Sequence, residues 1–254
     1  MEIITSIDNS FVKEARSLQE KKYRKLHGKF IIEGPKFVRD AINAGAKIDK
    51  IFVLSTKIAD YIEIIDMHKE KVYAVSERVF SKITDTENSQ GILAVAFLPK
   101  QASIIAGEDI LVLDRISDPG NMGTIIRTAA ATGYKTLLTI DSVDAFSPKV
   151  VRSSAGCLFN VNIYQMTERE VLDFTIKNKY NLMVADARGK NIFKMDKVKP
   201  PSALVIGNEA NGPSDAIKNA ATTLVSLPMK ENVESLNASV SASVLMYLIK
   251  KDNI

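Results

Sequence analysis

Three polar segments in the second half of the sequence carry side chains that could do chemistry. The first follows a Pro-Gly turn and runs from Asn121 to Arg127. On a helix, Asn121, Thr124 and Arg127 lie three residues apart and form one polar ridge. This spacing places one cation, that of Arg127, in the first turns of a helix that follows a buried strand. In the simplest alternative, Asn121 only caps the helix and Arg127 is a surface residue.

The second segment is the loop after the apolar run that ends at Gly207. It holds two glycines, two amides and one carboxylate, that of Glu209. Gly207 and Gly212 would let a backbone approach a ligand closely, and Glu209 has no evident structural duty in a loop. A plain turn followed by a helix cap at Ser214 is the structural alternative.

The third segment follows the apolar run that ends at Leu227. A polar loop comes first, and Ser235 is expected to open a helix from Leu236 to Lys250. Asn237 and Ser241 lie four residues apart on one side of that helix, among small residues that allow another backbone to come close. A capped and well-packed terminal helix is the structural alternative.

Side chains for several common kinds of catalysis are missing from the sequence. Its histidines and cysteines are His27, His68 and Cys157, which cannot assemble a Ser-His-Asp triad or a zinc cluster. The phosphate-binding patterns GxxxxGK[ST] and GxGxxG are absent too. The sequence therefore indicates chemistry in an organised polar pocket, without a metal ion and without a histidine base.

The composition suits a globular protein with two modest α/β domains. The chain has 254 residues, 46% hydrophobic and 25% charged. Strands and helices alternate in residues 1–98, an aperiodic stretch at 99–109 suits a linker, and a second series fills 110–254. The strands of this second series are continuous apolar runs, which predicts a parallel, doubly wound sheet with its ligand crevice at the carboxyl ends of the strands. These strands are expected at 110–113, 136–140, 161–164, 181–185, 203–207 and 222–227.

A basic arm lies near the amino terminus. Between Lys13 and Lys29 the sequence has seven cations and only two acids. Clustered lysine and arginine gain affinity for a polyanion by counterion release, so the arm predicts phosphate contact. The solvated face of one helix running from Asn9 or Ser10 towards Lys25 is the alternative. The cations assigned to this contact are Lys13, Arg16, Lys21, Lys22, Arg24 and Lys25.

The sequence also bears on the compartment. No apolar run approaches the roughly eighteen residues that a membrane span needs. The first residues lack the layout of a signal peptide, and a lone cysteine forms no intramolecular disulfide. We therefore expect a cytoplasmic protein with no membrane partner.

In this order, the three polar segments resemble the three signature motifs of the SpoU/TrmH family of RNA ribose 2′-O-methyltransferases, in the SPOUT class. The resemblance covers the chain from about residue 107 onward. The first domain is similar to the small RNA-binding domain that many members carry. The sequence is most similar to bacterial members that act on ribosomal RNA, in particular 23S RNA.

The resemblance implies a trefoil knot, a bent S-adenosylmethionine in the knotted pocket, a homodimer and no metal. It assigns cofactor contacts to Gly207, Leu227, Met229 and Leu236. It assigns catalysis to Asn121, Arg127, Glu209, Ser235 and Asn237. Ala210 and Pro213 depart from the commonest motif, where a glycine and a larger apolar residue are frequent. These departures affect the fit of the substrate more than the reaction.

The role of Arg127 and the identity of the substrate stay open at this level. The family's usual proposal makes the arginine the base that deprotonates the ribose 2′-hydroxyl. A guanidinium is effectively always protonated, so we favour a role in which Arg127 grips the phosphate beside the target ribose. Transfer RNA is the alternative substrate. The alternative functions are a non-catalytic RNA-binding assembly factor and a nucleotide-binding α/β protein of another kind.

Overall fold

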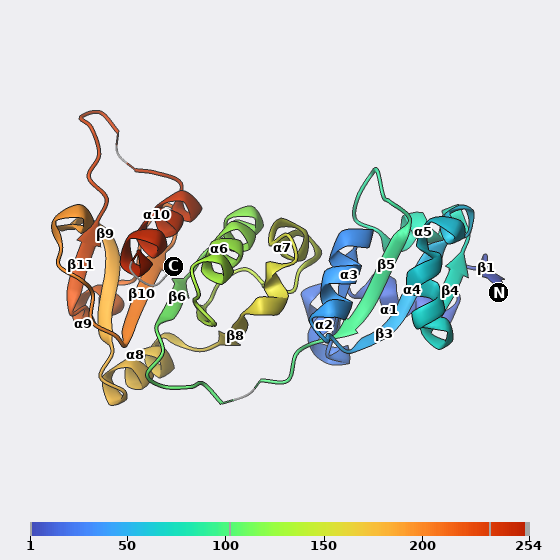
Figure 1. Ribbon diagram of the computed structural model, residues 1–254, viewed down its shortest axis with the longest axis horizontal. Helices are drawn as coiled ribbons and strands as arrows, with labels where there is room; N and C mark the ends of the chain where they lie inside the picture. Colours follow the sequence, from blue (N-terminus) through green and yellow to red (C-terminus); the bar gives the residue numbers. More distant parts are fainter. Residues whose placement is uncertain (1, 102, 234, 252–254) are drawn as a thin grey trace. The chain divides into compact units, whose positions relative to one another are not determined.

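The computed structural model describes residues 2–101, 103–233 and 235–251, which form two compact units (Figure 1). Unit 1 holds the chain up to residue 100 together with 146–159, and unit 2 holds the rest. The stretch 146–159 was expected in the second domain. It packs with unit 1 because the ring of Phe146 meets that of Phe30 edge-on, with 5.1 Å between ring centroids.

Unit 1 is built on a mixed sheet with the strand order β1-β4-β3-β5-β2. β3 runs parallel to β4 and antiparallel to β5, which also pairs antiparallel with β2. Apolar side chains of α1 and α5 cover one face of this sheet. Its elements are β1 (Ile3–Ile4), α1 (Ser10–Ser17), α2 (Lys21–His27), β2 (Lys29–Glu33), α3 (Pro35–Asn43), β3 (Ile48–Leu54), η1 (Ser55–Tyr61), α4 (Ile62–Met67), η2 (Lys69–Lys71), β4 (Val72–Val75), α5 (Glu77–Ile83), β5 (Ile92–Phe97), α7 (Pro148–Ser153) and, at the border with unit 2, η3 (Cys157–Asn160).

Unit 2 contains a six-stranded sheet with the order β11-β9-β10-β6-β7-β8. Every neighbouring pair in it is parallel, which confirms the predicted parallel α/β fold. Its elements are β6 (Ile110–Asp114), α6 (Pro119–Ala131), β7 (Thr136–Ile140), β8 (Asn162–Gln165), α8 (Glu168–Lys177), β9 (Asn181–Asn191), η4 (Ile192–Lys194), β10 (Ser202–Gly207), α9 (Asp215–Ala220), β11 (Thr223–Ser226) and α10 (Ala238–Lys250).

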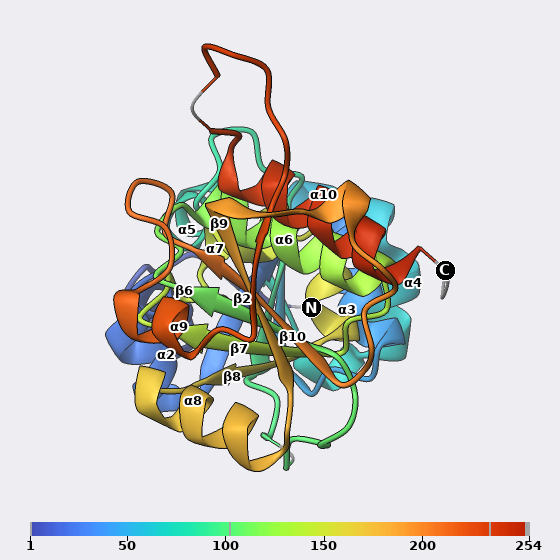
Figure 2. The same cartoon turned by 90° about the vertical axis from the view of Figure 1, so that its left-hand side faces the viewer.

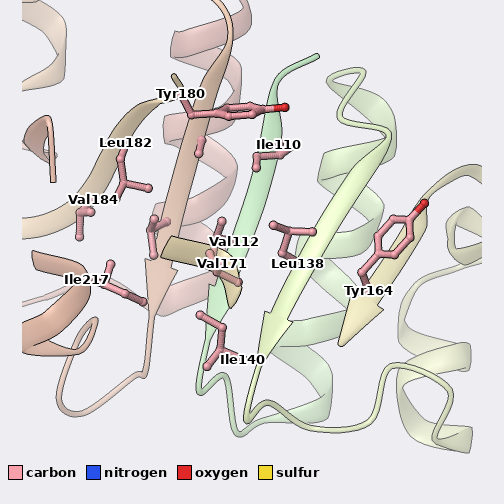
Figure 3. Packing of buried hydrophobic residues seen from close by; sticks show 12 residues of the cluster. Ile110, Val112, Leu138, Ile140, Tyr164, Val171, Tyr180, Leu182, Val184 and Ile217 are labelled. Carbon is pink, nitrogen blue, oxygen red and sulfur yellow. The ribbon is translucent and has the colours of Figure 1, made fainter. Parts of the chain in front are cut away.

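Helices cover both faces of the unit 2 sheet. Val171 of α8 and Ile217 of α9 join alternate strand residues such as Val112 and Leu138 in one buried cluster (Figure 3). α6 and α10 lie side by side on the other face (Figure 2). With both faces buried, the residues of the central strands are mostly apolar, which explains the continuous runs in the sequence.

Some boundaries differ from those expected. The single amino-terminal helix is two, because Glu20 is extended and begins α2 anew. β9 continues to Asn191, six residues past its predicted end at Ala185, since β11 pairs with its outer part as well. α10 begins later than predicted, because Asn237 caps it instead of Ser235.

The described ranges contain no helix long and apolar enough to cross a membrane. Within the same ranges, no group of three or more histidine, cysteine, aspartate or glutamate side chains could hold a metal ion.

Candidate functional site

The three polar segments leave the sheet of unit 2 at the same edge. β6 and β10 are parallel neighbours whose last residues, Asp114 and Gly207, lie opposite each other. β11 lies beyond β9, so the loop after β11 starts from this edge as well. The strand order reverses beside β6, with β7 and β8 on one side and β10 and β9 on the other. Doubly wound sheets bind their ligands at such a crevice.

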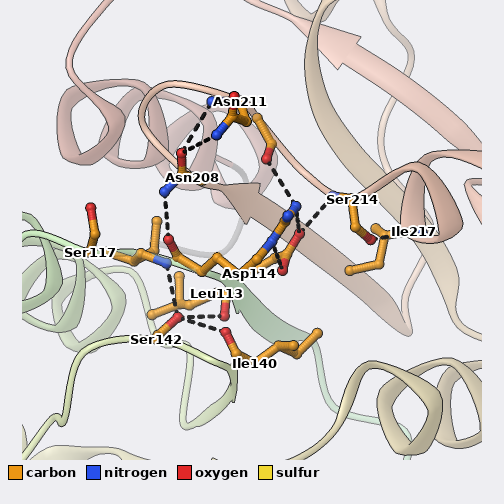
Figure 4. Close-up of polar contacts among 12 residues, drawn as sticks. Leu113, Asp114, Ser117, Ile140, Ser142, Asn208, Asn211, Ser214 and Ile217 are labelled. Carbon is orange, nitrogen blue, oxygen red and sulfur yellow. Dashed lines mark hydrogen bonds and ion pairs between the residues drawn. The ribbon is translucent and has the colours of Figure 1, made fainter.

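An ion pair at the end of β6 fastens the loop after β10 (Figure 4). Asp114 is fully buried, and its carboxylate accepts hydrogen bonds from the Arg115 guanidinium at 3.0 and 3.1 Å and from the Ser214 backbone N–H at 2.7 Å. Arg115 also donates to the carbonyl of Gly212 at 3.4 Å, and Asn208 donates to the carbonyl of Arg115 at 2.9 Å. A buried carboxylate needs such partners. The loop after β10 is therefore held by contacts within the protein itself.

Glu209 joins this loop to the one after β6. Its carboxylate accepts hydrogen bonds from the side-chain amide of Asn121 and from the hydroxyl of Ser117, both at 2.9 Å. The backbone N–H of Ser117 adds a third, at 3.3 Å. α6 is capped by Asp118, which accepts from the Asn121 backbone N–H at 2.8 Å. The Asn121 side chain therefore does not cap the helix, and its amide donates to Glu209 instead.

These contacts set the charge of Glu209. Partial burial raises the pKa of its carboxyl, but the hydrogen bonds from Asn121 and Ser117 outweigh burial and leave this pKa below its usual value. A carboxylate with a lowered pKa is a weak proton acceptor at neutral pH. In this geometry Glu209 is an anionic strut between two loops.

A cleft of about 510 Å³ opens where the loops meet. Such a volume is typical of a pocket for a small molecule. The walls come from the middle of β9, from the ends of β10 and β11 with the loops that follow them, and from α10. Among the residues to which the resemblance assigned cofactor contacts or catalysis, those that line it are Gly207, Glu209, Leu227, Met229, Ser235 and Leu236.

Three residues assigned to catalysis do not line the cleft. Asn121 reaches it only through Glu209. The Asn237 side-chain oxygen accepts from the backbone N–H groups of Ser239 at 2.9 Å and Val240 at 3.3 Å, as a helix cap does. Arg127 is exposed on α6, and among the described residues it has no hydrogen-bond or ion-pair partner.

One wall of the cleft was not anticipated. Ala185 to Arg188 and Lys218 form it, with Asp186 paired to Arg188 at 3.3 Å and to Lys218 at 3.7 Å. The Asp-x-Arg pattern directly after an apolar run was the available signal. It was overlooked because polar residues in the outer half of β9 resemble a loop.

Gly207 is required by the protein's own backbone. A Cβ at this position would overlap the backbone of Gly212 and Pro213. The loop folds back on the strand here, and Asn208 and Gly212 form an isolated antiparallel bridge. Close approach to a ligand was the predicted reason for this glycine, and the structure adds the return of its own loop.

Comparison with known proteins identifies the family. Residues 108–247 match the model of the SpoU rRNA Methylase family. The chain belongs to this family. A second model, the MRM3-like substrate binding domain, matches residues 9–94.

Relatives of this SpoU-family chain match most of its length. It is 29% identical to the 23S rRNA (guanosine(2553)-2'-O)-methyltransferase RlmP of Bacillus subtilis, over 98% of this chain and 100% of that protein. It is 28% identical to the 23S rRNA (adenosine(1067)-2'-O)-methyltransferase of Streptomyces laurentii, over 88% and 86%. It also resembles the crystal structure of an AdoMet-bound rRNA methyltransferase from Sinorhizobium meliloti, with a TM-score of 0.86, 27% identity and coverage of 100% and 98%.

The basic arm of unit 1 divides into exposed and buried cations. Arg24 is only 4% exposed, and its guanidinium donates to the carbonyls of Leu18 and Gln19, both at 2.7 Å. Arg24 differs from the other cations assigned to RNA contact, because its side chain turns inward and donates to the carbonyls at the end of α1. The exposed cations are Lys13, Arg16, Lys21, Lys22 and Lys25.

We expect the exposed and buried cations to respond differently to substitution. Replacing Lys21, Lys22 and Lys25 together with glutamine should make the salt dependence of RNA affinity shallower by about two in a log–log plot, with unfolding unchanged.

Arg24→Ala leaves two carbonyls without their donor, which should lower the free energy of unfolding by about 1–3 kcal/mol. Urea titration measures this loss. An Arg24→Ala protein as stable as its parent would contradict the structural role.

Proposed function

We propose that this protein methylates a ribose 2′-hydroxyl of ribosomal RNA, with S-adenosylmethionine as the methyl donor. Its family supports the reaction, and the relatives described above are named as 23S rRNA 2′-O-methyltransferases. The observation that carries the proposal is the 2.9 Å hydrogen bond from Asn121 to Glu209 at the cleft. This contact joins the first polar segment to the second beside the cleft. Ser235 and Leu236 of the third segment line the same cleft.

The cleft suits S-adenosylmethionine in size and in lining. Leu227, Met229 and Leu236 supply apolar surface for an adenine ring, and the loop after β10 supplies backbone polar groups. These residues and Gly207 would hold the cofactor. When bound, it supplies a methyl group already activated on a sulfonium sulfur. The protein's own task is therefore to hold the ribose hydroxyl in line and to exclude water.

We assign the acceptor side to Arg127, Ser235 and Asn237. A guanidinium stays protonated, so Arg127 is assigned to the phosphate beside the target ribose, where its fork can make two hydrogen bonds. The cap of α10 uses only the side-chain oxygen of Asn237, which leaves its N–H groups for a ligand. Ser235 lines the cleft and can donate or accept at the hydroxyl.

Glu209→Gln should lower the rate of methyl transfer by about 10²-fold, because an amide cannot accept from Asn121 and Ser117 at once as the carboxylate does. Stability should fall by only about 1 kcal/mol. The matched control is Glu231→Gln, an exposed carboxylate in the loop after β11. Parent-like kinetics in Glu209→Gln would remove the strut from the proposal.

The same pair of proteins gives a pH test. Because the pKa of Glu209 is lowered in the folded protein, its stabilisation is complete above the usual value of 4.5. It is lost as the pH falls through the lowered pKa. The stability difference between the parent and Glu209→Gln, measured by urea titration, should therefore shrink in acid. A difference that stays constant from neutral pH down to strong acid would contradict the assignment.

The proposal names the class of RNA that is methylated and no single nucleotide. One relative is named for a guanosine and the other for an adenosine of 23S rRNA, so their names do not indicate one position. We propose 23S rRNA as the substrate and the cytoplasm as the place where the protein meets it.

We extend the proposal to a homodimer formed by α6 and α10. Within one chain these helices already contact each other: the hydroxyl of Thr128, the residue after Arg127, lies 2.9 Å from that of Ser243. Val240 and Tyr247 leave apolar surface on α10, being 47% and 49% exposed. A second copy would cover this surface. Light scattering should give twice the chain mass, and a monomer would rule this part out.

A trefoil knot completes the proposed architecture. The chain leaves β11 at the edge of the sheet and returns to α10, which packs against α6 and β10 (Figure 2). The test is an experimental structure of the chain. A backbone path that can be straightened by pulling its two ends has no knot and would refute this part of the proposal.

The decisive experiment is methyl transfer in vitro followed by mapping. The purified protein is incubated with tritiated S-adenosylmethionine and ribosomal RNA from cells that lack it, and the labelled ribose is located. Label in one 23S nucleotide is the expected result. Transfer to transfer RNA alone would replace the substrate. Cofactor binding without any transfer would favour an assembly factor, and a protein that binds no S-adenosylmethionine would overturn the proposal.

A further inference from the structure

The segment from Arg188 to Lys194, the rim segment, is a basic surface that the proposed function leaves unused. It contains three cations and no acid. The Arg188 side chain is 80% exposed, and Lys190 and Lys194 are exposed as well. Phe193 lies among them with 63% of its surface exposed. These residues belong to unit 2 and are separate from the basic arm of unit 1.

The rim segment begins in the wall of the cleft. Arg188 lines the cleft, and the carbonyl of Gly189 accepts a hydrogen bond from the Ser226 hydroxyl at 2.9 Å. Lys190 pairs with Val225 across β9 and β11. A Cβ at Gly189 would overlap the backbone of β11, so the two strands are in close contact there. The start of the rim segment is therefore fixed beside the loop that carries the third polar segment.

Asp186, the acid that pairs with Arg188, does not cancel the charge of the rim segment. The Asp186 side chain is 9% exposed, and it pairs with Arg188 at 3.3 Å and with Lys218 at 3.7 Å. Asp215 also acts on the charge of Arg188, so the excess positive charge lies on Lys190 and Lys194, which have no ion-pair partner among the described residues. A surplus of this kind next to a substrate cleft attracts a polyanion.

Phe193 sits on a fixed turn. The side chain of Asn191 accepts a hydrogen bond from the Phe193 backbone N–H at 2.9 Å, which caps η4. The neighbouring Ile192 is only 7% exposed and anchors the turn in the core. Single-stranded nucleic acid is bound by exposed aromatic rings, on which bases stack, combined with cations that meet the phosphates. The rim segment has both.

We propose that the rim segment binds the single-stranded RNA that leads into the cleft, with a base stacked on Phe193 and phosphates on Lys190 and Lys194. This inference rests on the proposed function, because it adds substrate contacts to the same cleft. A second protein chain could also cover an exposed ring. The cations on both sides of Phe193 favour RNA.

The test compares variants of the full chain by fluorescence anisotropy with a labelled single-stranded RNA of mixed sequence. Phe193→Leu keeps an apolar side chain but cannot stack, so it should weaken binding about tenfold, whereas Phe193→Tyr should stay within about twofold. Lys190→Gln with Lys194→Gln should make the log–log salt dependence shallower by about 1.4. The matched control is Lys135→Gln with Lys177→Gln, two exposed lysines at the amino-terminal edge of the same sheet. This control should keep the parent's slope.

The outcomes separate this inference from the proposed function. If the parent methylates RNA while both rim variants keep its affinity, slope and KM, the rim inference is wrong and the proposed function stands. If the parent transfers no methyl group but the rim variants still lose RNA affinity, the rim site stands and the proposed function fails. A rim variant that becomes monomeric by light scattering while keeping its RNA affinity would show a protein interface, which overturns the inference. Calorimetry should show unchanged S-adenosylmethionine binding in all variants.

Discussion

Arg127→Ala should reduce the rate of methyl transfer by about 10²- to 10³-fold while leaving S-adenosylmethionine affinity almost unchanged. The two effects separate because Arg127 does not line the cleft that would hold the cofactor. Its exposed guanidinium, with no partner among the described residues, is available for the RNA phosphate. Tritium transfer measures the first quantity and calorimetry the second.

Two further variants sharpen this prediction. Arg169→Ala removes another exposed guanidinium from unit 2, at the start of α8, and should leave the rate unchanged. Arg127→Lys keeps a positive charge but loses the two-pronged hydrogen bond. Most activity retained in Arg127→Lys would argue against the phosphate fork. A fully active Arg127→Ala would remove Arg127 from the site.

Gly207→Ala should abolish measurable S-adenosylmethionine binding, with a fall in affinity of about 10²-fold or more. The added Cβ would overlap the backbone of Gly212 and Pro213, which no side-chain movement can relieve. The loop after β10 must then move away from the strand. Glu209 would move with it and lose its contacts with the loop after β6. Calorimetry reports the affinity, and urea titration reports the accompanying loss of stability.

Gly133→Ala is the matched control for this second prediction. Gly133 has a positive φ of 79° and open space around it, so alanine there is strained by its backbone conformation alone. It should lower stability by about 1 kcal/mol and leave cofactor affinity intact. Equal loss of affinity in both variants would mean that Gly207 acts through general stability. Normal binding in Gly207→Ala would show that the loop can relax without harm to the cleft.

Much of unit 2 was predictable because its order is local. The bounds of β7 and α8 follow from continuous apolar runs and from a capping box at Thr167 and Glu170. The four residues to which the resemblance assigned cofactor contacts all line the cleft. Gly207 ends β10 and Leu227 directly follows β11, while Met229 and Leu236 lie in the loop after β11. Parallel strands bring their ends to one edge whatever the details of packing.

Other assignments depended on partners that spacing cannot reveal. In the sequence, Arg24 is one of six equivalent cations. In the structure, its guanidinium donates to two carbonyls at the end of α1. The membership of 146–159 in unit 1 rests on packing against a strand more than a hundred residues earlier in the chain.

The sequence by itself determined the family, the parallel sheet and the strand ends from which the site is built, since apolar periodicity and short motifs are local properties. Only the tertiary structure decided what each polar side chain does there. Asn121 and Glu209 are 88 residues apart in the chain, and nothing in either motif indicates that they bond to each other. Folding brings β6 beside β10, and this pairing places the Glu209 carboxylate where it joins two loops and has a lowered pKa.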